Sequence, residues 1–335
     1  MNAKKNLSIE TLRGIAILLV VMGHVIGSGP TGGMKIDFPH PLRYLYVWID
    51  YIQMPLFTAI AGWVYALKPF SISVTFKSFF HKKVMRLLIP MAVVGTLYFF
   101  VQYIIPGTNR KGDFGEIWRI YVFPYTIYWY LPSLFLIFMV QWIIDCRHWM
   151  QTTRQWIIWC IVSLFLSVTN DMGIMHLIPN LFSFKGALGQ LPYFFAGVAA
   201  YRFHSLYHLP NARWFVAGAI LSGFILIQLV WYSPNHEASV SHLLYGLTLI
   251  PVLFLLLNIK WKNRFCTWIG GYAYSIYLFH GFGTSGGRIL LKAIGINSTP
   301  VIFIFATIIA VCCSIMVDAL ASRFKWSRKL LLGVR

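Results

Sequence analysis

Ten long apolar segments are the feature of this sequence that most limits its fold. A helix needs about 20 apolar residues to cross the hydrocarbon core of a bilayer, and runs near that length recur along the 335 residues. Only 11% of the residues are charged and 58% are hydrophobic, too little charged surface for a soluble protein of this size. The pattern predicts an all-α, polytopic membrane helix bundle of about ten transmembrane helices, at 8–26, 45–67, 85–105, 125–144, 155–170, 186–202, 213–232, 240–258, 267–282 and 299–320.

Basic residues are divided unevenly between the expected loops. A formal net charge of +19 could by itself suggest nucleic-acid binding. With a cytoplasmic N-terminus, however, 19 of the 28 Lys and Arg residues fall on the cytoplasmic side and 8 on the outer side. This asymmetry follows the positive-inside rule and places both termini in the cytoplasm. The charge therefore predicts topology, with contacts to membrane lipids or an anionic ligand, and no nucleic acid.

Short loops connect the segments, so residues 1–335 are expected to form a single membrane domain. The longest gaps, at 27–44 and 106–124, are rich in Gly, Pro and aromatic residues. The five cysteines have no spacing suited to zinc or an iron–sulfur cluster, and no metal is expected.

An arginine and a histidine lie inside the first segment, SIETLRGIAILLVVMGHVIG. Arg13 and His24 are eleven residues apart, which at about 100° per residue places them on one helix face, about 16 Å apart along the axis. Ionisable side chains within a membrane are costly and mark functional positions. Arg13 would lie near the cytoplasmic end, where it could instead snorkel or pair with Glu10. His24 would lie near the outer end, where a neutral imidazole can take a proton.

A basic loop follows the second segment and reads FKSFFHKKVMRLLIP over residues 76–90. It brings Lys82, Lys83 and Arg86 to the start of a helix that Pro90 is expected to interrupt. Clustered cations beside free backbone donors can bind phosphate. The same loop also suits a positive-inside stop signal in contact with lipids.

Further polar residues lie within or beside the later segments. Tyr277 and His280 in GGYAYSIYLFHGF (270–282) are neighbours on a helix. They form either part of a site or a polar contact between helices. Asp50, in the second segment, either orients His24 or lies at the water interface.

Several sequence blocks, in order, resemble the membrane acyltransferase 3 family, particularly its small members that O-acetylate surface sugars and lack a fused extracytoplasmic esterase-like domain. The family's hallmark is an arginine and a histidine separated by ten residues in the first helix, which Arg13 and His24 match within LRGIAILLVVMGH. The later blocks are MPLFTAIAGWVY (54–65), YWYLPSLF (128–135), LPYFFAGVAAYR (191–202) and YSIYLFH (274–280).

The chain departs from the family pattern at three places. Ala61 replaces the usual serine before a glycine, and Ile127 and Tyr128 stand where a histidine is often found. Lys83 replaces the first arginine of a paired-arginine loop. This keeps the positive charge but loses the bidentate fork of a guanidinium.

The resemblance implies an integral membrane O-acetyltransferase of the bacterial cytoplasmic (inner) membrane. Its donor would be acetyl-CoA, entering from the cytoplasm, and its acceptor a hydroxyl of a glycan or lipid-linked sugar on the outer side. The donor's phosphates would meet Arg13, Lys82, Lys83 and Arg86, and its thioester would reach His24, acting as the general base. Asp50, Trp129, Tyr277 and His280 would support the site or the acceptor. A direct transfer and a transient acyl-histidine are both compatible with these residues.

Two other classes of protein fit some of the same features. A transporter or exporter of a glycan precursor or small anion could use Arg13 and His24 as a substrate or proton relay. No internal repeat of the kind many transporters carry is visible. A non-catalytic assembly partner would need neither His24 nor the basic loop.

Overall fold

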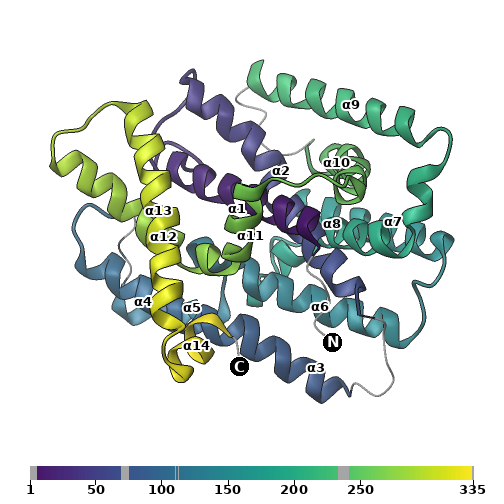
Figure 1. The fold of residues 1–335 in the computed structure, drawn as a ribbon, viewed down its shortest axis with the longest axis horizontal. Helices are drawn as coiled ribbons and strands as arrows, with labels where there is room; N and C mark the ends of the chain where they lie inside the picture. The colour runs from purple at the N-terminus through teal and green to yellow at the C-terminus, as the bar shows by residue number, and fades with distance from the viewer. Residues whose placement is uncertain (1–5, 69–74, 110, 112, 233–240, 334–335) are drawn as a thin grey trace.

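The computed structural model describes residues 6–68, 75–109, 111, 113–232 and 241–333 (Figure 1). Within these ranges the chain forms helices and helical turns and no strand, which confirms the all-α prediction. The helices are α1 (Leu7–Ile26), α2 (Pro41–Ala66), α3 (Phe76–Lys83), α4 (Ile89–Ile104), α5 (Arg119–Val122), α6 (Tyr130–Cys146), α7 (Thr153–Asp171), α8 (Phe184–Arg202), α9 (Ala212–Tyr232), α10 (Ser241–Asn258), α11 (Arg264–Gly271), α12 (Ala273–Ala293), α13 (Thr299–Ala321) and α14 (Lys325–Leu332).

Five helical stretches in the described part of the chain are long and apolar enough to cross a membrane. They are Leu7–Ile26, Phe76–Ile104, Phe114–Cys146, Ala212–Leu229 and Thr299–Ala321. Helices also occupy the other predicted segments; among them Leu243–Asn258 is apolar but shorter. The segment predicted at 267–282 has wrong boundaries, because Tyr272 separates α11 from α12, and α12 continues to Ala293. That extension contains Ser, Gly and Arg residues, which an apolar-run criterion does not include.

Helix α1 lies in the middle of the bundle and packs against α2, α11, α12 and α13 (Figure 1). Its approach to α11 requires glycine on both helices. A Cβ atom on Gly14 would lie 1.9 Å from the Cys266 carbonyl oxygen, and one on Gly270 would lie 2.1 Å from that of Glu10. Thr11 and Thr267 share a 2.8 Å hydrogen bond at the same contact. Close packing of small residues therefore fixes the half of α1 that carries Arg13.

The opposite end of α1 is held by a buried arginine from α2. Arg43 is 5% exposed and donates from Nη1 to the Gly27 carbonyl at 2.8 Å and from Nη2 to the Ser28 carbonyl at 2.7 Å. These carbonyls follow the last turn of α1, where helix backbone acceptors have no partner within the helix. This contact holds the turn that contains His24.

A π-helical turn (Val84–Leu88) joins α3 to α4, so the predicted interruption at Pro90 is wrong. The Ile89 amide bonds to the Val84 carbonyl across this turn. Pro90 has no N–H to reach the Arg86 carbonyl, and the Tyr274 hydroxyl of α12 donates to that carbonyl instead. The wider turn and the tyrosine let the helix pass Pro90 and keep the basic loop against the bundle.

The helices at the edge of the bundle expose large apolar side chains. Helix α9 lies along the top edge of Figure 1, with Phe215 70% exposed, and α13 exposes Met316 at 63%. Such surface is suited to lipid rather than water. The short helix α14 packs against α4 and the π-helical turn. The bundle thus places apolar surface outside and its polar contacts within.

The glycine contact between α1 and α11 leads to a test with adjacent residues. Gly270→Ala should destabilise the protein by about 1–3 kcal/mol, because the added methyl would overlap the backbone of α1. Gly271→Ala is the control, since nothing lies within 4 Å of a Cβ at that position. Thermal unfolding in detergent measures both. Equal stability of the two variants would contradict the packing.

Candidate active site

Two histidines from distant parts of the chain meet near the C-terminal end of α1. The ring of His24 lies 5.0 Å from the ring of His280 on α12, measured between centroids, with 37° between their planes. His24 is half-buried, whereas His280 is fully buried. The structure therefore brings together two of the residues that the sequence indicated separately.

The imidazole of His280 is held by the backbone of its own helix. Its Nδ1 lies 2.9 Å from the Ile276 carbonyl oxygen and 2.8 Å from that of Tyr277. Both partners are acceptors, so Nδ1 is the nitrogen that carries the hydrogen. The other nitrogen, Nε2, is a buried acceptor with no hydrogen-bond partner among the described residues.

Aromatic side chains from four elements form a series of ring contacts that begins at His280. The Tyr277 ring lies 6.0 Å from His280, 5.8 Å from Tyr130 and 6.2 Å from Phe57. Its hydroxyl donates to the Ile127 carbonyl at 2.6 Å. Trp129 joins the group through Tyr130, at 5.9 Å. Tyr277 and Trp129 thus belong to the walls of the region next to the histidines.

Asp50 occupies a different position from the one that would orient His24 directly. It is exposed on α2, where it accepts hydrogen bonds from Tyr46 at 3.2 Å and from Gln53 at 2.9 Å. Gln53 lies against Gly23, the residue before His24, because a Cβ there would be 2.7 Å from the glutamine Oε1. The ring that packs on His24 is that of His280.

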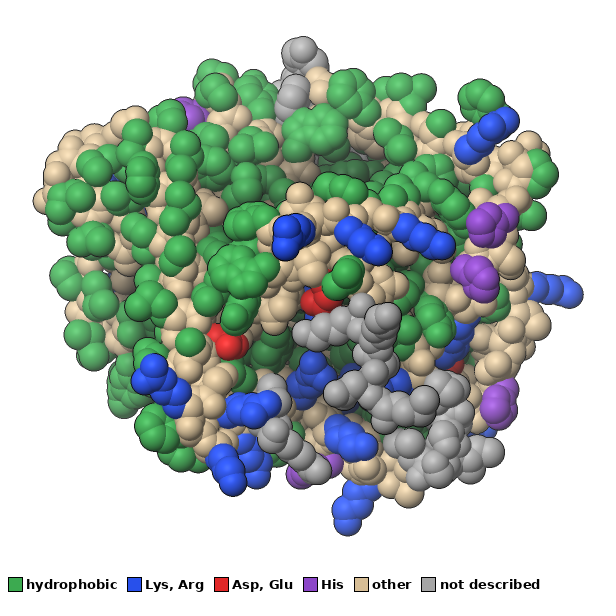
Figure 2. All heavy atoms as spheres, viewed as in Figure 1, with side chains coloured by type: hydrophobic (Ala, Val, Ile, Leu, Met, Phe, Trp, Pro, Cys, Tyr) green, Lys and Arg blue, Asp and Glu red, His purple; other side chains and the backbone are tan. Residues whose placement is uncertain are grey.

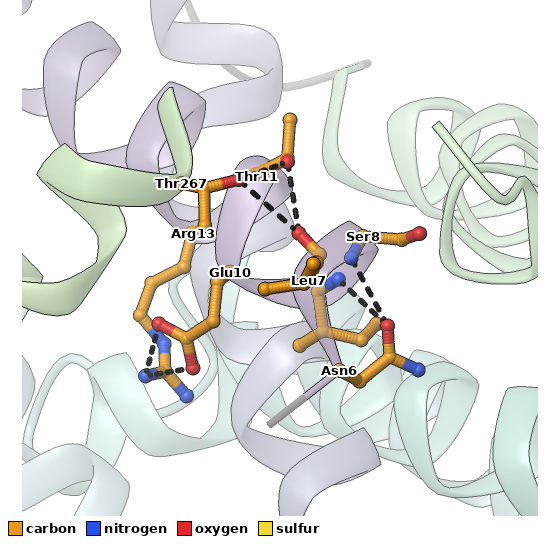
Figure 3. A network of polar contacts seen from close by, with 8 residues as sticks. Asn6, Leu7, Ser8, Glu10, Thr11, Arg13 and Thr267 are labelled. Atoms are coloured by element: carbon orange, nitrogen blue, oxygen red, sulfur yellow. Dashed lines mark hydrogen bonds and ion pairs between the residues drawn. The ribbon is translucent and has the colours of Figure 1, made fainter. Parts of the chain in front are cut away.

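Arg13 lies near the other end of α1 and pairs with Glu10 at 3.0 Å, as the spacing predicted (Figure 3). The two side chains leave α1 on one side, while Thr11 reaches Thr267 on another. Asn6 caps the start of the helix by accepting from the Ser8 and Ile9 amides at 3.0 and 3.3 Å. Arg13 therefore lies in the second turn of a helix whose start is capped by a side chain.

A cluster of cations surrounds Arg13 on this side of the bundle. Arg86 is close enough to act electrostatically on both Arg13 and Lys83, and Lys68 acts on Lys83. The Lys83 ammonium lies 3.0 Å from the centre of the Phe138 ring. Lys82, next along α3, is exposed. Figure 2 shows Lys and Arg side chains gathered over the centre and lower part of this face.

Asp145, a carboxylate close to this cluster, already has several partners. Asp145 is 1% exposed and binds both nitrogens of the Arg202 fork, at 2.7 and 2.6 Å. It also accepts from the Tyr65 hydroxyl at 2.8 Å and the Gln141 amide at 3.0 Å. The Tyr65 ring lies 5.9 Å from Phe138, the ring under Lys83. Asp145 is thus saturated close to the basic cluster.

Ion pairs in the described part of the chain involve Arg13, Arg119 and Arg202. Lys83 and Arg86 are in none of them. Positive charges without a neighbouring carboxylate are suited to an anionic ligand, phosphate above all. Within the described ranges, no group of three or more His, Cys, Asp or Glu side chains is placed to hold a metal ion.

Several residues of this arrangement were missed by sequence reasoning. Asp145 directly follows the predicted segment 125–144, and a carboxylate at that position could have been paired with an arginine. Arg202 ends the block LPYFFAGVAAYR, where its charge suggested topology alone. Tyr274 lies in the block YSIYLFH that the sequence singled out, but its contact with the carbonyl left free by Pro90 could not be predicted.

Comparison with known proteins adds one finding. A family model described as an acyltransferase domain matches residues 6–319. The matched range extends from the cap of α1 into α13 and includes both histidines, the basic cluster and the Asp145 contact. Neither the curated proteins nor the solved structures gave a significant match.

The Asp145 contact can be tested against an exposed ion pair. Asp145→Asn should destabilise the protein by about 3 kcal/mol, because it leaves Arg202 without its countercharge in the bundle. Glu116→Gln is the control, since the Glu116–Arg119 pair is about half exposed on both sides and should change stability by less than about 1 kcal/mol. Denaturation in detergent compares the two, and a similar loss in both would refute a dominant role for Asp145.

Proposed function

The chain belongs to the membrane acyltransferase 3 family, and from that premise we propose that it transfers an acetyl group from acetyl-CoA to a hydroxyl of an extracytoplasmic glycan. It is an acyltransferase and an integral membrane protein. The proposed acceptor classes are a surface polysaccharide, such as an exopolysaccharide, and a lipid-linked sugar. The observation that carries the proposal is a basic cluster and a histidine pair on opposite ends of one helix, α1.

The proposed orientation places the basic cluster in the cytoplasm. We propose about ten spans, both termini inside and residues 1–335 as one domain in the bacterial inner membrane. Helices at all ten predicted segments and the uneven placement of Lys and Arg support this arrangement. The face of Figure 2 that carries the cations would then lie on the donor side.

The donor's phosphates would bind Lys83 and Arg86, with Arg13 and the exposed Lys82 beside them. Phosphate oxygens accept strong hydrogen bonds from cationic donors. The saturated Asp145 and the pairing of Glu10 with Arg13 leave the charges of Lys83 and Arg86 for such a ligand. Acetyl-CoA supplies phosphates at one end and a thioester at the end of a thin arm. Along α1 the distance from Arg13 to His24 is about 16 Å, so an extended arm can connect the two ends.

The proposed reaction uses His24 as general base. A lone pair of its imidazole takes the proton of the acceptor hydroxyl while the oxygen attacks the thioester carbonyl. The new C–O bond forms and the C–S bond breaks, and the proton passes from His24 to the leaving thiolate. His24 ends neutral, as it began. Tyr277, Trp129 and Phe57 form apolar walls that would keep water away from the thioester.

His24→Ala should abolish acetyl transfer, with a loss of about 10²-fold or more in kcat, because the imidazole that would take the hydroxyl proton is removed. Binding of acetyl-CoA should stay near the wild-type level. His176→Ala is the control, since this exposed histidine bonds only to the Gly173 carbonyl. Transfer of labelled acetyl by purified protein gives the rates. A His24→Ala variant with wild-type turnover would remove the base from the mechanism.

Lys83→Ala and Arg86→Ala should each raise KM for acetyl-CoA about tenfold, the loss of one charge-assisted contact. We expect acetyl-pantetheine, which lacks the nucleotide phosphates, to be a poor donor, and neither substitution should change the rate with it. Arg154→Ala, at an exposed arginine, is the matched control. An equal loss with both donors would mean that the cluster does not bind phosphate.

A further inference from the structure

We propose that His280 is the positioning residue for His24, and that its Nε2 accepts the N–H of the His24 ring when the acceptor binds. This inference rests on the proposed function and names the group that sets the protonation form of the base. The first observation is the fixed state of His280. With Nδ1 bonded to the Ile276 and Tyr277 carbonyls, the hydrogen is on Nδ1 and the lone pair is on Nε2.

The lone pair of His280 Nε2 lacks a donor in a place where that is costly. His280 is 0% exposed and Nε2 has no hydrogen-bond partner among the described residues. A buried acceptor left unsatisfied costs about 1–3 kcal/mol. We therefore expect Nε2 to accept a hydrogen bond when the acceptor substrate is bound.

Hydroxyls on α12 or bonded to its backbone donate to carbonyls. Tyr277 donates to Ile127 at 2.6 Å and Tyr128 donates to Leu278 at 2.9 Å. Thr284, one turn beyond His280, donates to Gly281 at 3.2 Å. These hydroxyl hydrogens are therefore committed, whereas the ring of His24, which packs on His280, carries an N–H.

A turn of the His24 ring would make the contact. The two centroids are 5.0 Å apart with a tilt of 37°, which is close packing of the rings without a hydrogen bond. The terminal torsion of a histidine side chain has broad minima, so a rotation is inexpensive. The His24 N–H then bonds to His280 Nε2, and the opposite His24 nitrogen presents its lone pair to the acceptor hydroxyl.

This arrangement gives the base the same support as other catalytic histidines, in which a third group holds the ring and its tautomer. His280 is itself oriented by two carbonyls on α12. After His24 takes the hydroxyl proton on one nitrogen, the N–H of its other nitrogen still bonds to His280. The transient imidazolium therefore has a polar neighbour in the bundle. The half-buried His24 contacts the substrate, and the fully buried His280 acts through it.

Two substitutions of His280 separate positioning from packing. A Gln side chain reaches as far as Nε2 and can offer an oxygen there, whereas Asn reaches only as far as Nδ1. His280→Gln should keep kcat within about tenfold of wild type, and His280→Asn should lower kcat about 10²-fold. KM for acetyl-CoA should be unchanged in both. A purely structural role predicts the opposite order, because Asn preserves the contact with the carbonyls.

A higher kcat in His280→Gln than in His280→Asn supports the proposal. A kcat in His280→Asn that equals or exceeds that of His280→Gln overturns it. Should neither variant fold, ¹⁵N-histidine NMR of the wild-type protein with bound acceptor decides. A nitrogen–nitrogen coupling that disappears in the His24→Ala variant supports the contact, and its absence in the wild type overturns it. The proposed function fails separately, through full activity of His24→Ala.

Discussion

Close backbone packing of α1 against its neighbours is the contact on which the whole site depends. Gly14 and Gly270 allow α1 and α11 to touch, and Arg43 holds the last turn of α1 through two carbonyls. With both ends fixed, Arg13 faces the basic cluster and His24 faces His280. A rotation of α1 by one residue would separate both pairs, since each residue turns the helix by about 100°. The same helix therefore sets the geometry at each end of the proposed donor path.

Distribution of countercharge decides which cations can bind a ligand. Asp145 is consumed by Arg202, Tyr65 and Gln141, and Glu10 pairs with Arg13. Buried charge that is paired and hydrogen-bonded holds helices together, and charge without a partner attracts an anion. In this chain both kinds of charge lie close together. The paired carboxylate Asp145 is on α6, and Lys83 and Arg86 lie at and within the π-helical turn. The Arg202–Asp145 ion pair holds α6 and α8 together, while Lys83 and Arg86 stay available to bind an anion.

Periodicity in the sequence predicted the local part of this picture, and tertiary contacts determined the rest. The shared face of Arg13 and His24 follows from helix geometry alone, as does the Arg13–Glu10 pair. The meeting of His24 with His280 depends on the register between helices 256 residues apart in the chain, which no local pattern contains. Pro90 suggested a helix break because the compensating hydroxyl of Tyr274 lies far along the sequence. For Asp50 the sequence left open a contact with His24 or a place at the water interface, and in the structure it is exposed and accepts from Tyr46 and Gln53 of its own helix.

Transfer across the bilayer is the central claim of this account, because the basic cluster and the histidine pair lie at opposite ends of α1. Proteoliposomes with a single orientation allow the donor and the acceptor to be supplied on chosen sides. We predict acetylated acceptor when acetyl-CoA is on the side of the Lys83–Arg86 loop and the acceptor is enclosed on the opposite side. Product formed only when donor and acceptor share one side would contradict a donor path that runs along α1.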